Sequence, residues 1–168
     1  MIAITSTYNK CFGYAALLVV LLPLFLAGIA EGQSENREII IHYEQIIQEA
    51  ARKWLKKNHT GALNSFFSAK ELLLFHMPQH DNSYAWNTFF TLKIYTVLLT
   101  RLAEIELYQT EKHLKLADEV KKEALDWAVV LEGQMNVWKN IKSPSSADGK
   151  IRLKWVKRMQ AVIRKVKK

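Results

Sequence analysis

Apolar side chains recur at intervals of three and four residues through most of the chain, and this spacing restricts the fold more than any other feature of the sequence. Between residues 35 and 58 the repeated positions include Ile40, Tyr43, Ile47 and Trp54. Residues three and four apart lie on one face of an α-helix, so the spacing indicates an amphipathic helix. No stretch shows the alternation of apolar and polar residues, bounded by turn dipeptides, that a strand needs. The sequence therefore predicts an all-α protein.

Turn signals divide the periodic region into helices. Asn58 and Gly61 indicate the C-cap of the first helix, and Pro78 must end the second, because the residue before a proline avoids the helical conformation. Ser83 is a suitable N-cap for the third helix. No glycine or proline marks the end of the third, but a helix of more than about 50 residues is unusual, so we expect a turn near Gln109. The predicted helices are 35–58, 60–77, 84–108, 110–141 and 150–168.

Short connections between consecutive helices favour antiparallel neighbours, so we expect an antiparallel bundle of about four to five helices. The third helix is apolar on nearly every side and should lie at its centre. In the second helix the periodicity places Phe67 and Leu74 among the inward-facing residues, and the fourth helix carries Leu114 and Leu125 among its apolar residues. The predicted bundle domain spans 31–142, and the stretch SPSSADG at 143–149 has the composition of a linker.

One pattern within the helices resembles part of a tetratricopeptide unit. Ala62, Phe66 and Ala69 have the spacing of its second helix, and Ala117 and Ala124 repeat part of that spacing. The interval between the two matches is 55 residues, whereas such repeats recur at about 34. Small residues also allow any two helices to approach closely, so we favour ordinary helix packing.

Residues 1–30 are predicted to be a targeting segment. The run 11–30 contains no charged residue, Lys10 is the only charged side chain before it, and Gly28 and Ala30 precede a polar stretch, as at a signal-peptide cleavage site. We expect cleavage after Ala30. The alternative is an uncleaved signal-anchor, because about 20 apolar residues can span a bilayer. Both alternatives place the body of the protein outside the cytoplasm, either exported (secreted or periplasmic) or anchored in a membrane.

Motifs for catalysis and cofactor binding are missing from the sequence. The single cysteine excludes a disulfide scaffold, a cysteine-based zinc site, covalent haem attachment and an iron–sulfur cluster. Neither GxSxG nor HExxH occurs, and there is no glycine-rich phosphate loop and no Glu-x-x-His pair of the di-iron bundles. We therefore expect a protein without enzymatic activity, catalytic residues or a cofactor.

His76, His80 and Asp81 form the best candidate metal site, and it is a weak one. Two histidines four apart on a helix can bind zinc or copper. Pro78 lies between them, however, and should end the helix before His80. We therefore interpret the three as polar residues at a helix end and expect no metal.

The segment Asn58-His59-Thr60 matches the N-glycosylation acceptor pattern. It falls in a predicted turn and, by the argument above, outside the cytoplasm. We expect Asn58 to be modified only if the chain passes through a eukaryotic secretory pathway.

The strongest indication of function lies in residues 150–168, KIRLKWVKRMQAVIRKVKK, which contain nine Lys and Arg and no acid. Residues 31–149, in contrast, carry 14 basic and 16 acidic side chains. On a helical wheel most of the apolar residues of 150–168 fall within an arc of about 140°. This is the pattern of a basic amphipathic helix. Its candidate contact residues are Lys150, Arg152, Lys154, Trp155, Lys157, Arg158, Arg164, Lys165, Lys167 and Lys168.

Such a helix has several uses. Its apolar stripe could simply dock on the bundle and leave the basic face in water, or the helix could contact an anionic membrane or envelope surface, or a protein partner. Nucleic acid is disfavoured, because the body is expected outside the cytoplasm. Our principal hypothesis is an exported, non-enzymatic binding or structural protein that uses this helix. The alternatives are a single-pass membrane-anchored component of a larger envelope assembly and a small histidine-based metal-binding protein.

Overall fold

The structure is a computed structural model that describes residues 35–77, 83–143 and 145–167. Within these ranges the chain forms five helices and no strand. The all-α prediction is confirmed for these residues. The predicted targeting segment, 1–30, lies outside them. The helices are α2 (Glu35–Leu55), α3 (His59–Phe75), α4 (Tyr84–Thr110), α5 (Leu114–Asn140) and α6 (Ser146–Val166).

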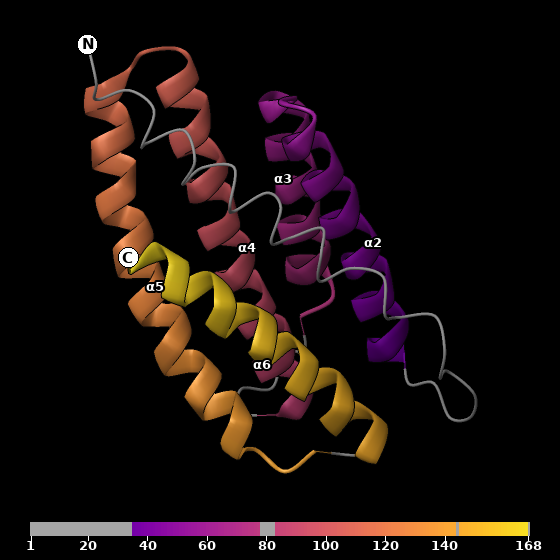
Figure 1. The fold of residues 1–168 in the computed structure, drawn as a ribbon. Coiled ribbons are helices and arrows are strands. Elements are labelled where there is room, and N and C mark those ends of the chain that lie inside the picture. Colours follow the sequence, from indigo (N-terminus) through magenta and orange to yellow (C-terminus); the bar gives the residue numbers. More distant parts are fainter. Residues whose placement is uncertain (1–34, 78–82, 144, 168) are drawn as a thin grey trace.

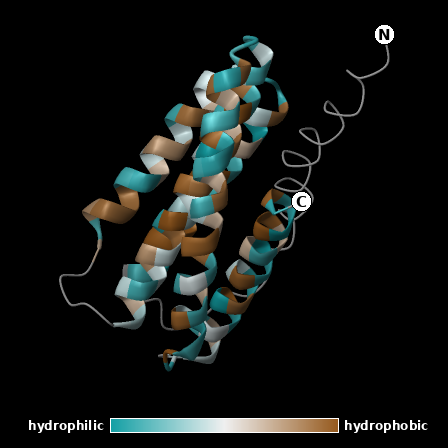
Figure 2. Ribbon diagram, turned by 90° about the vertical axis from the view of Figure 1, so that its left-hand side faces the viewer, coloured by the Kyte–Doolittle hydropathy of each residue, from teal (hydrophilic) through white to brown (hydrophobic). Residues whose placement is uncertain are grey.

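Two antiparallel helix pairs pack side by side and the last helix crosses them. α2 pairs with α3, α4 pairs with α5, and α3 packs against α4 (Figure 1). α6 lies obliquely across one side of this array (Figure 1). The helices carry mixed hydrophilic and hydrophobic faces, as expected for amphipathic elements that share one core (Figure 2).

The two hairpin turns use a residue type that the sequence did not predict for them. Lys57 and Lys112 have φ angles of 62° and 64°, in the left-handed region. After each, the next amide donates back to the helix: Asn58 N to the Lys53 carbonyl at 3.0 Å, and His113 N to the Tyr108 carbonyl at 2.8 Å. This closes the helix end in the way that a glycine normally does. The predicted turn near Gln109 is thus confirmed and lies just beyond it.

Asn58 has a different role from the one predicted. It is the N-cap of α3, not the C-cap of α2, and its side chain accepts a hydrogen bond from the Gly61 amide at 2.9 Å. A Cβ on Gly61 would lie 2.6–2.8 Å from three atoms of the Asn58 side chain. Glycine at this position therefore leaves room for the cap.

The 55-residue interval is the length of one helical hairpin with its connection. Lys57 and Lys112 stand 55 positions apart, and equivalent positions on the two hairpins are buried. The matched buried pairs are Ile40 and Tyr95, Tyr43 and Leu98, Ile47 and Leu102, Ala62 and Ala117, Ala69 and Ala124, and Leu73 and Ala128. The alanines permit close approach within each hairpin, so one packing scheme is used twice.

α4 is the central helix, as predicted from its composition. It has the largest fraction of buried residues among the described helices, and it hydrogen-bonds to α2 at two points along its length. The Tyr43 hydroxyl lies 2.8 Å from the Thr96 hydroxyl, and the Trp54 indole donates to the Glu106 carboxylate at 2.6 Å. Burial raises the pKa of Glu106, and the indole and the nearby Lys57 oppose that shift.

Two expectations about the helices are wrong. Phe67 and Leu74 of α3 are exposed, although periodicity placed both inward. The reason is that the helices packed against α3 cover only part of its apolar arc. α6 begins at Ser146 instead of Lys150, because Ser145 caps it by accepting from the Asp148 amide at 3.1 Å. Residues 146–149 of the predicted linker 143–149 are therefore helical.

Candidate functional site: the basic helix α6

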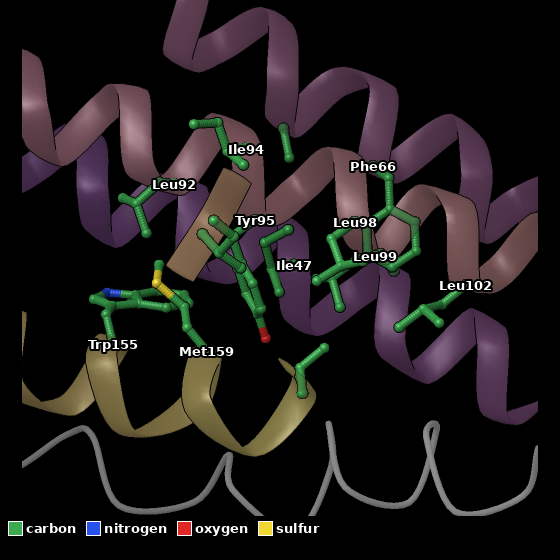
Figure 3. Close-up of a cluster of buried hydrophobic side chains, with 14 of the residues drawn as sticks. Ile47, Phe66, Leu92, Ile94, Tyr95, Leu98, Leu99, Leu102, Trp155 and Met159 are labelled. Carbon is green, nitrogen blue, oxygen red and sulfur yellow. The ribbon is translucent and has the colours of Figure 1, made fainter. Parts of the chain in front are cut away.

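The apolar stripe of α6 packs into the core of the bundle. Its buried residues are Trp155, Val156, Met159, Val162, Ile163 and Val166. Figure 3 shows Trp155 and Met159 pointing from α6 toward Leu92 and Tyr95 of α4 and Ile47 of α2. The stripe that the sequence predicted is present, and in this structure the protein itself covers it.

Trp155 lies in the core, although it was a candidate contact residue. Its side chain is 1% exposed, and its ring centroid lies 5.6 Å from that of Tyr43 and 6.0 Å from that of Tyr95. Aromatic pairs at this separation add to the burial of apolar surface. Trp155 could meet a partner only if α6 left the bundle.

Arg158, a second candidate, is also buried. Its guanidinium pairs with the Glu44 carboxylate of α2 at 3.0 Å, and the two residues are 8% and 6% exposed. The same guanidinium lies 4.9 Å from the centroid of the Trp155 ring. A charge in this position is acceptable only because it is paired. Arg158 therefore fixes the position of α6 on α2 and is not available at the surface.

Polar contacts also hold both ends of α6. At its N-terminal end Arg37 of α2 pairs with Asp148 at 3.1 Å, and the Tyr84 hydroxyl donates to the Asp148 carbonyl at 2.8 Å. At its C-terminal end Lys167 pairs with Glu132 of α5 at 2.6 Å. These contacts reach three different helices, so they define the direction in which α6 crosses the bundle.

Arg152 satisfies the end of the preceding helix. Its guanidinium donates to the carbonyl oxygens of Trp138 and Ile141 at 2.8 and 2.5 Å. Carbonyls in the last turn of a helix lack partners within the helix, and a cation there also matches the helix dipole. Arg152, predicted as a contact residue, therefore serves the α5–α6 connection.

The outer face of α6 carries the remaining cations. Lys150, Lys157 and Arg164 are exposed and recur every seven residues, and we call these three the basic ridge. At 1.5 Å per residue the successive Cα atoms are about 10 Å apart. Lys154 and Lys165 flank the ridge and are partly buried, whereas Lys168 lies outside the described residues. Burial, together with the charge of Arg158, lowers the pKa of Lys154 to about 8, and Glu44 opposes that shift.

Three acidic residues at α6 form ion pairs with residues outside the basic ridge. Glu44 pairs with Arg158, Asp148 with Arg37 and Glu132 with Lys167. Each of these pairs lies at the edge of α6 or beneath it, away from the ridge. The outward face of the helix is thus positive along its length, with Leu153 as its one exposed large apolar side chain.

The candidate metal residues are not brought together in the described structure. His76 ends α3 and its ring lies 4.9 Å from that of Phe75, whereas His80 and Asp81 lie outside the described residues. Within the ranges that the structure describes, no three side chains of the metal-binding types cluster.

Asn58 is exposed at the α2–α3 turn, and its Oδ1 is the atom that caps α3. Glycosylation modifies the other side-chain atom, Nδ2. The cap geometry is therefore compatible with the predicted modification.

Sequence reasoning did not identify the acidic partners of α6. Glu44 lies in a predicted amphipathic helix as an ordinary polar residue, and nothing in its spacing marks it as buried. Its only signal is its place beside Tyr43 on the apolar stripe, where a carboxylate requires a cation. The same reasoning did not identify Asp148, because it fell in the predicted linker.

The comparisons with known proteins give no relative. No family model matches the chain, and no curated protein and no solved structure shows significant similarity to it. None of the helices in the described ranges is both long enough and apolar enough to cross a membrane. The features of this chain that bear on function are therefore those of α6 itself.

Proposed function

We propose that this protein is a non-enzymatic binding protein that contacts an anionic surface through the basic ridge of α6. One observation carries the proposal: Lys150, Lys157 and Arg164 line one exposed side of a helix whose other side is fixed to the bundle. When cations stand on a helix that is already held in place, binding orders only their side chains and not the backbone, so little conformational entropy is lost. The bundle then serves as a rigid support for a linear array of positive charge.

The buried stripe of α6 distinguishes between ways of binding. An amphipathic helix that enters a membrane or a partner's groove uses its apolar side. In α6 that side is covered by α2, α4 and α5, so binding through the ridge is electrostatic and superficial. We therefore expect affinity to fall steeply with salt, because exposed charges are screened within about 8 Å at physiological ionic strength.

The targeting segment gives the proposal its location. The uncharged run 11–30 is expected to lead to export, and the exported body would then meet phosphate- or carboxylate-rich polymers and lipid headgroups. A retained segment would hold the same ridge close to a membrane surface. The function proposed for α6 is the same in both cases.

Charge reversal on the ridge tests the proposal. The triple variant Lys150→Glu, Lys157→Glu and Arg164→Glu should lose binding to soluble polyphosphate and to vesicles of anionic phosphatidylglycerol, by at least tenfold. The matched control reverses three exposed lysines of α5, Lys115, Lys121 and Lys122, and makes the same change in net charge. Circular dichroism checks that all the proteins keep their helices.

The probes also separate the sources of negative charge. Binding to the vesicles alone would indicate headgroups, and binding to polyphosphate as well would indicate a polymer or a general anionic surface. Either result supports the proposal if the ridge variant loses it. The proposal is overturned if the unaltered protein binds neither probe, or if the α5 variant loses as much affinity as the ridge variant.

A further inference from the structure

His59 is a buried titratable side chain at the α2–α3 turn. It is the first residue of α3 and is 6% exposed, and neither of its ring nitrogens has a hydrogen-bond partner among the described residues. Most buried polar atoms in proteins are hydrogen-bonded. A neutral imidazole tolerates such a site better than a charged one, because burying a charge without a partner is much more costly. The surroundings of His59 therefore favour its neutral form.

Two charged groups act on the ring, one from each of the neighbouring helices. Lys57 follows α2, and Glu111 follows α4 in the α4–α5 turn, which lies at the same end of the bundle as the α2–α3 turn (Figure 1). Burial lowers the pKa of His59, Lys57 lowers it further, and Glu111 opposes that shift with a smaller effect. The imidazole is therefore harder to protonate in the folded protein than in the unfolded chain.

Glu106 of α4 is a second buried titratable group at this end of the bundle. Its Oε2 accepts a hydrogen bond from the Trp54 indole and lies 4.0 Å from the Lys57 Nζ, and burial raises its pKa. The folded protein therefore binds a proton at Glu106 more readily than the unfolded chain does, so acid favours the folded state at this residue. Of these two groups, only His59 makes acid unfavourable to folding.

We propose that His59 is an acid-sensitive switch that opens the first turn of α3 when its ring takes up a proton. A protonated ring carries a charge in a covered site beside Lys57, and it loses this cost by moving into water. His59 directly follows Asn58, the N-cap of α3, so its movement disrupts the cap and the first turn. The rest of the bundle stays folded, because helix ends open at a lower free energy than the core. This inference is independent of the basic ridge, which lies on α6.

Urea denaturation between pH 7.5 and 5 tests the proton linkage. The folded pKa of His59 lies below the unfolded value of about 6.5, so the unfolded chain binds more protons below this pH and stability falls with the pH. The unfolding constant of the unaltered chain, divided by that of His59→Gln, should rise at least threefold from pH 7.5 to 5. This ratio cancels effects common to both proteins, including that of Glu106. If His59→Gln does not fold, His59→Leu replaces it in the same ratio.

His113→Gln is the matched control, because it removes an exposed histidine from the neighbouring α4–α5 turn. The same ratio measured with this variant should stay constant within about 1.5-fold over the pH range.

Amide hydrogen exchange tests where the protein opens. The amides of Gly61 and Ala62 donate to Asn58 in the first turn of α3. At pH 5 they should exchange through an opening with an equilibrium constant larger than that of global unfolding, and this constant should be at least threefold smaller in His59→Gln. The proposal is overturned if the stability ratio for His59→Gln does not change with pH, if it rises equally for His113→Gln, or if these amides exchange only through global unfolding.

Discussion

Replacing Glu44 by glutamine tests whether the seating of α6 depends on its buried ion pair. Glutamine keeps the size of the side chain and removes its charge, and Arg158 then loses a carboxylate at 3.0 Å in a site where both residues are more than 90% buried. Removing one partner of a buried pair costs about 3–5 kcal/mol. Because Arg158 also stacks on Trp155, we expect the lower end, about 3 kcal/mol of unfolding free energy. Domains of this size have about 5–15 kcal/mol in total, so the variant should still fold.

Replacing both partners separates the pair from its surroundings. In the double variant Glu44→Leu, Arg158→Met, apolar side chains of similar length occupy the site and no buried charge remains. Such replacements are often neutral or stabilising. We expect the double variant to lie within about 1 kcal/mol of the unaltered protein. As a control, Lys167→Met breaks the exposed pair with Glu132 and should cost less than about 1 kcal/mol.

Urea denaturation at pH 7, followed by tryptophan fluorescence and circular dichroism, measures these free energies. Trp155 touches the pair and reports on its immediate surroundings. If Glu44→Gln costs no more than Lys167→Met, the pair is not important for stability. If the double variant costs as much as Glu44→Gln, the reasoning about an uncompensated charge is wrong.

Three further changes have defined outcomes. Gly61→Ala should destabilise the chain by about 1 kcal/mol in urea denaturation, because the new methyl group displaces the Asn58 cap; an unchanged midpoint would show that the cap tolerates it. Lys112→Gly should stabilise it by about 0.5–1 kcal/mol, since glycine adopts a φ of 64° without a steric penalty, and a loss of stability would contradict the assigned turn. Lys154→Met should raise the thermal midpoint at pH 7 and have little effect near pH 11. The folded protein binds fewer protons at Lys154 than the unfolded chain between pH 8 and 10.5, so this lysine opposes folding below that window and not above it; an equal gain at both pH values would refute the assignment.

The sequence was sufficient to predict the number, type and approximate limits of the helices. Their apolar spacing is a direct consequence of burying one side of each helix, as with Tyr43, Ile47 and Trp54 of α2. The helix ends were less predictable. Lys57 and Lys112 adopt a backbone conformation that lysine rarely takes, because the antiparallel packing of each hairpin outweighs the local preference.

The exposed faces were mispredicted for a related reason. Periodicity gives the apolar arc of a helix and not how much of that arc its neighbours cover. Phe67 and Leu74 belong to the arc of α3, yet the neighbouring helices cover only part of it. The sequence alone therefore could not distinguish an inner residue from one on a second, outward surface.

The candidate site was only partly predictable. A basic amphipathic helix has the same pattern whether it docks on its own protein or on a membrane. The helix docks on its own protein if the bundle offers partners for its side chains. Here Glu44 pairs with Arg158, and Arg37 pairs with Asp148. Those matches join residues more than a hundred positions apart, so no local pattern contains them.

The position of α6 has a consequence for the order in which the protein folds. The α6 residues that cover Tyr43 and Tyr95 are synthesised after α2, α3, α4 and α5, and until they emerge from the ribosome the side of the bundle that they cover remains open to water. Chains generally fold during synthesis as their parts become available. Here the core can be completed only after α6 has been made, so a chain cut short before α6 would lack both this cover and the positive charge that α6 carries.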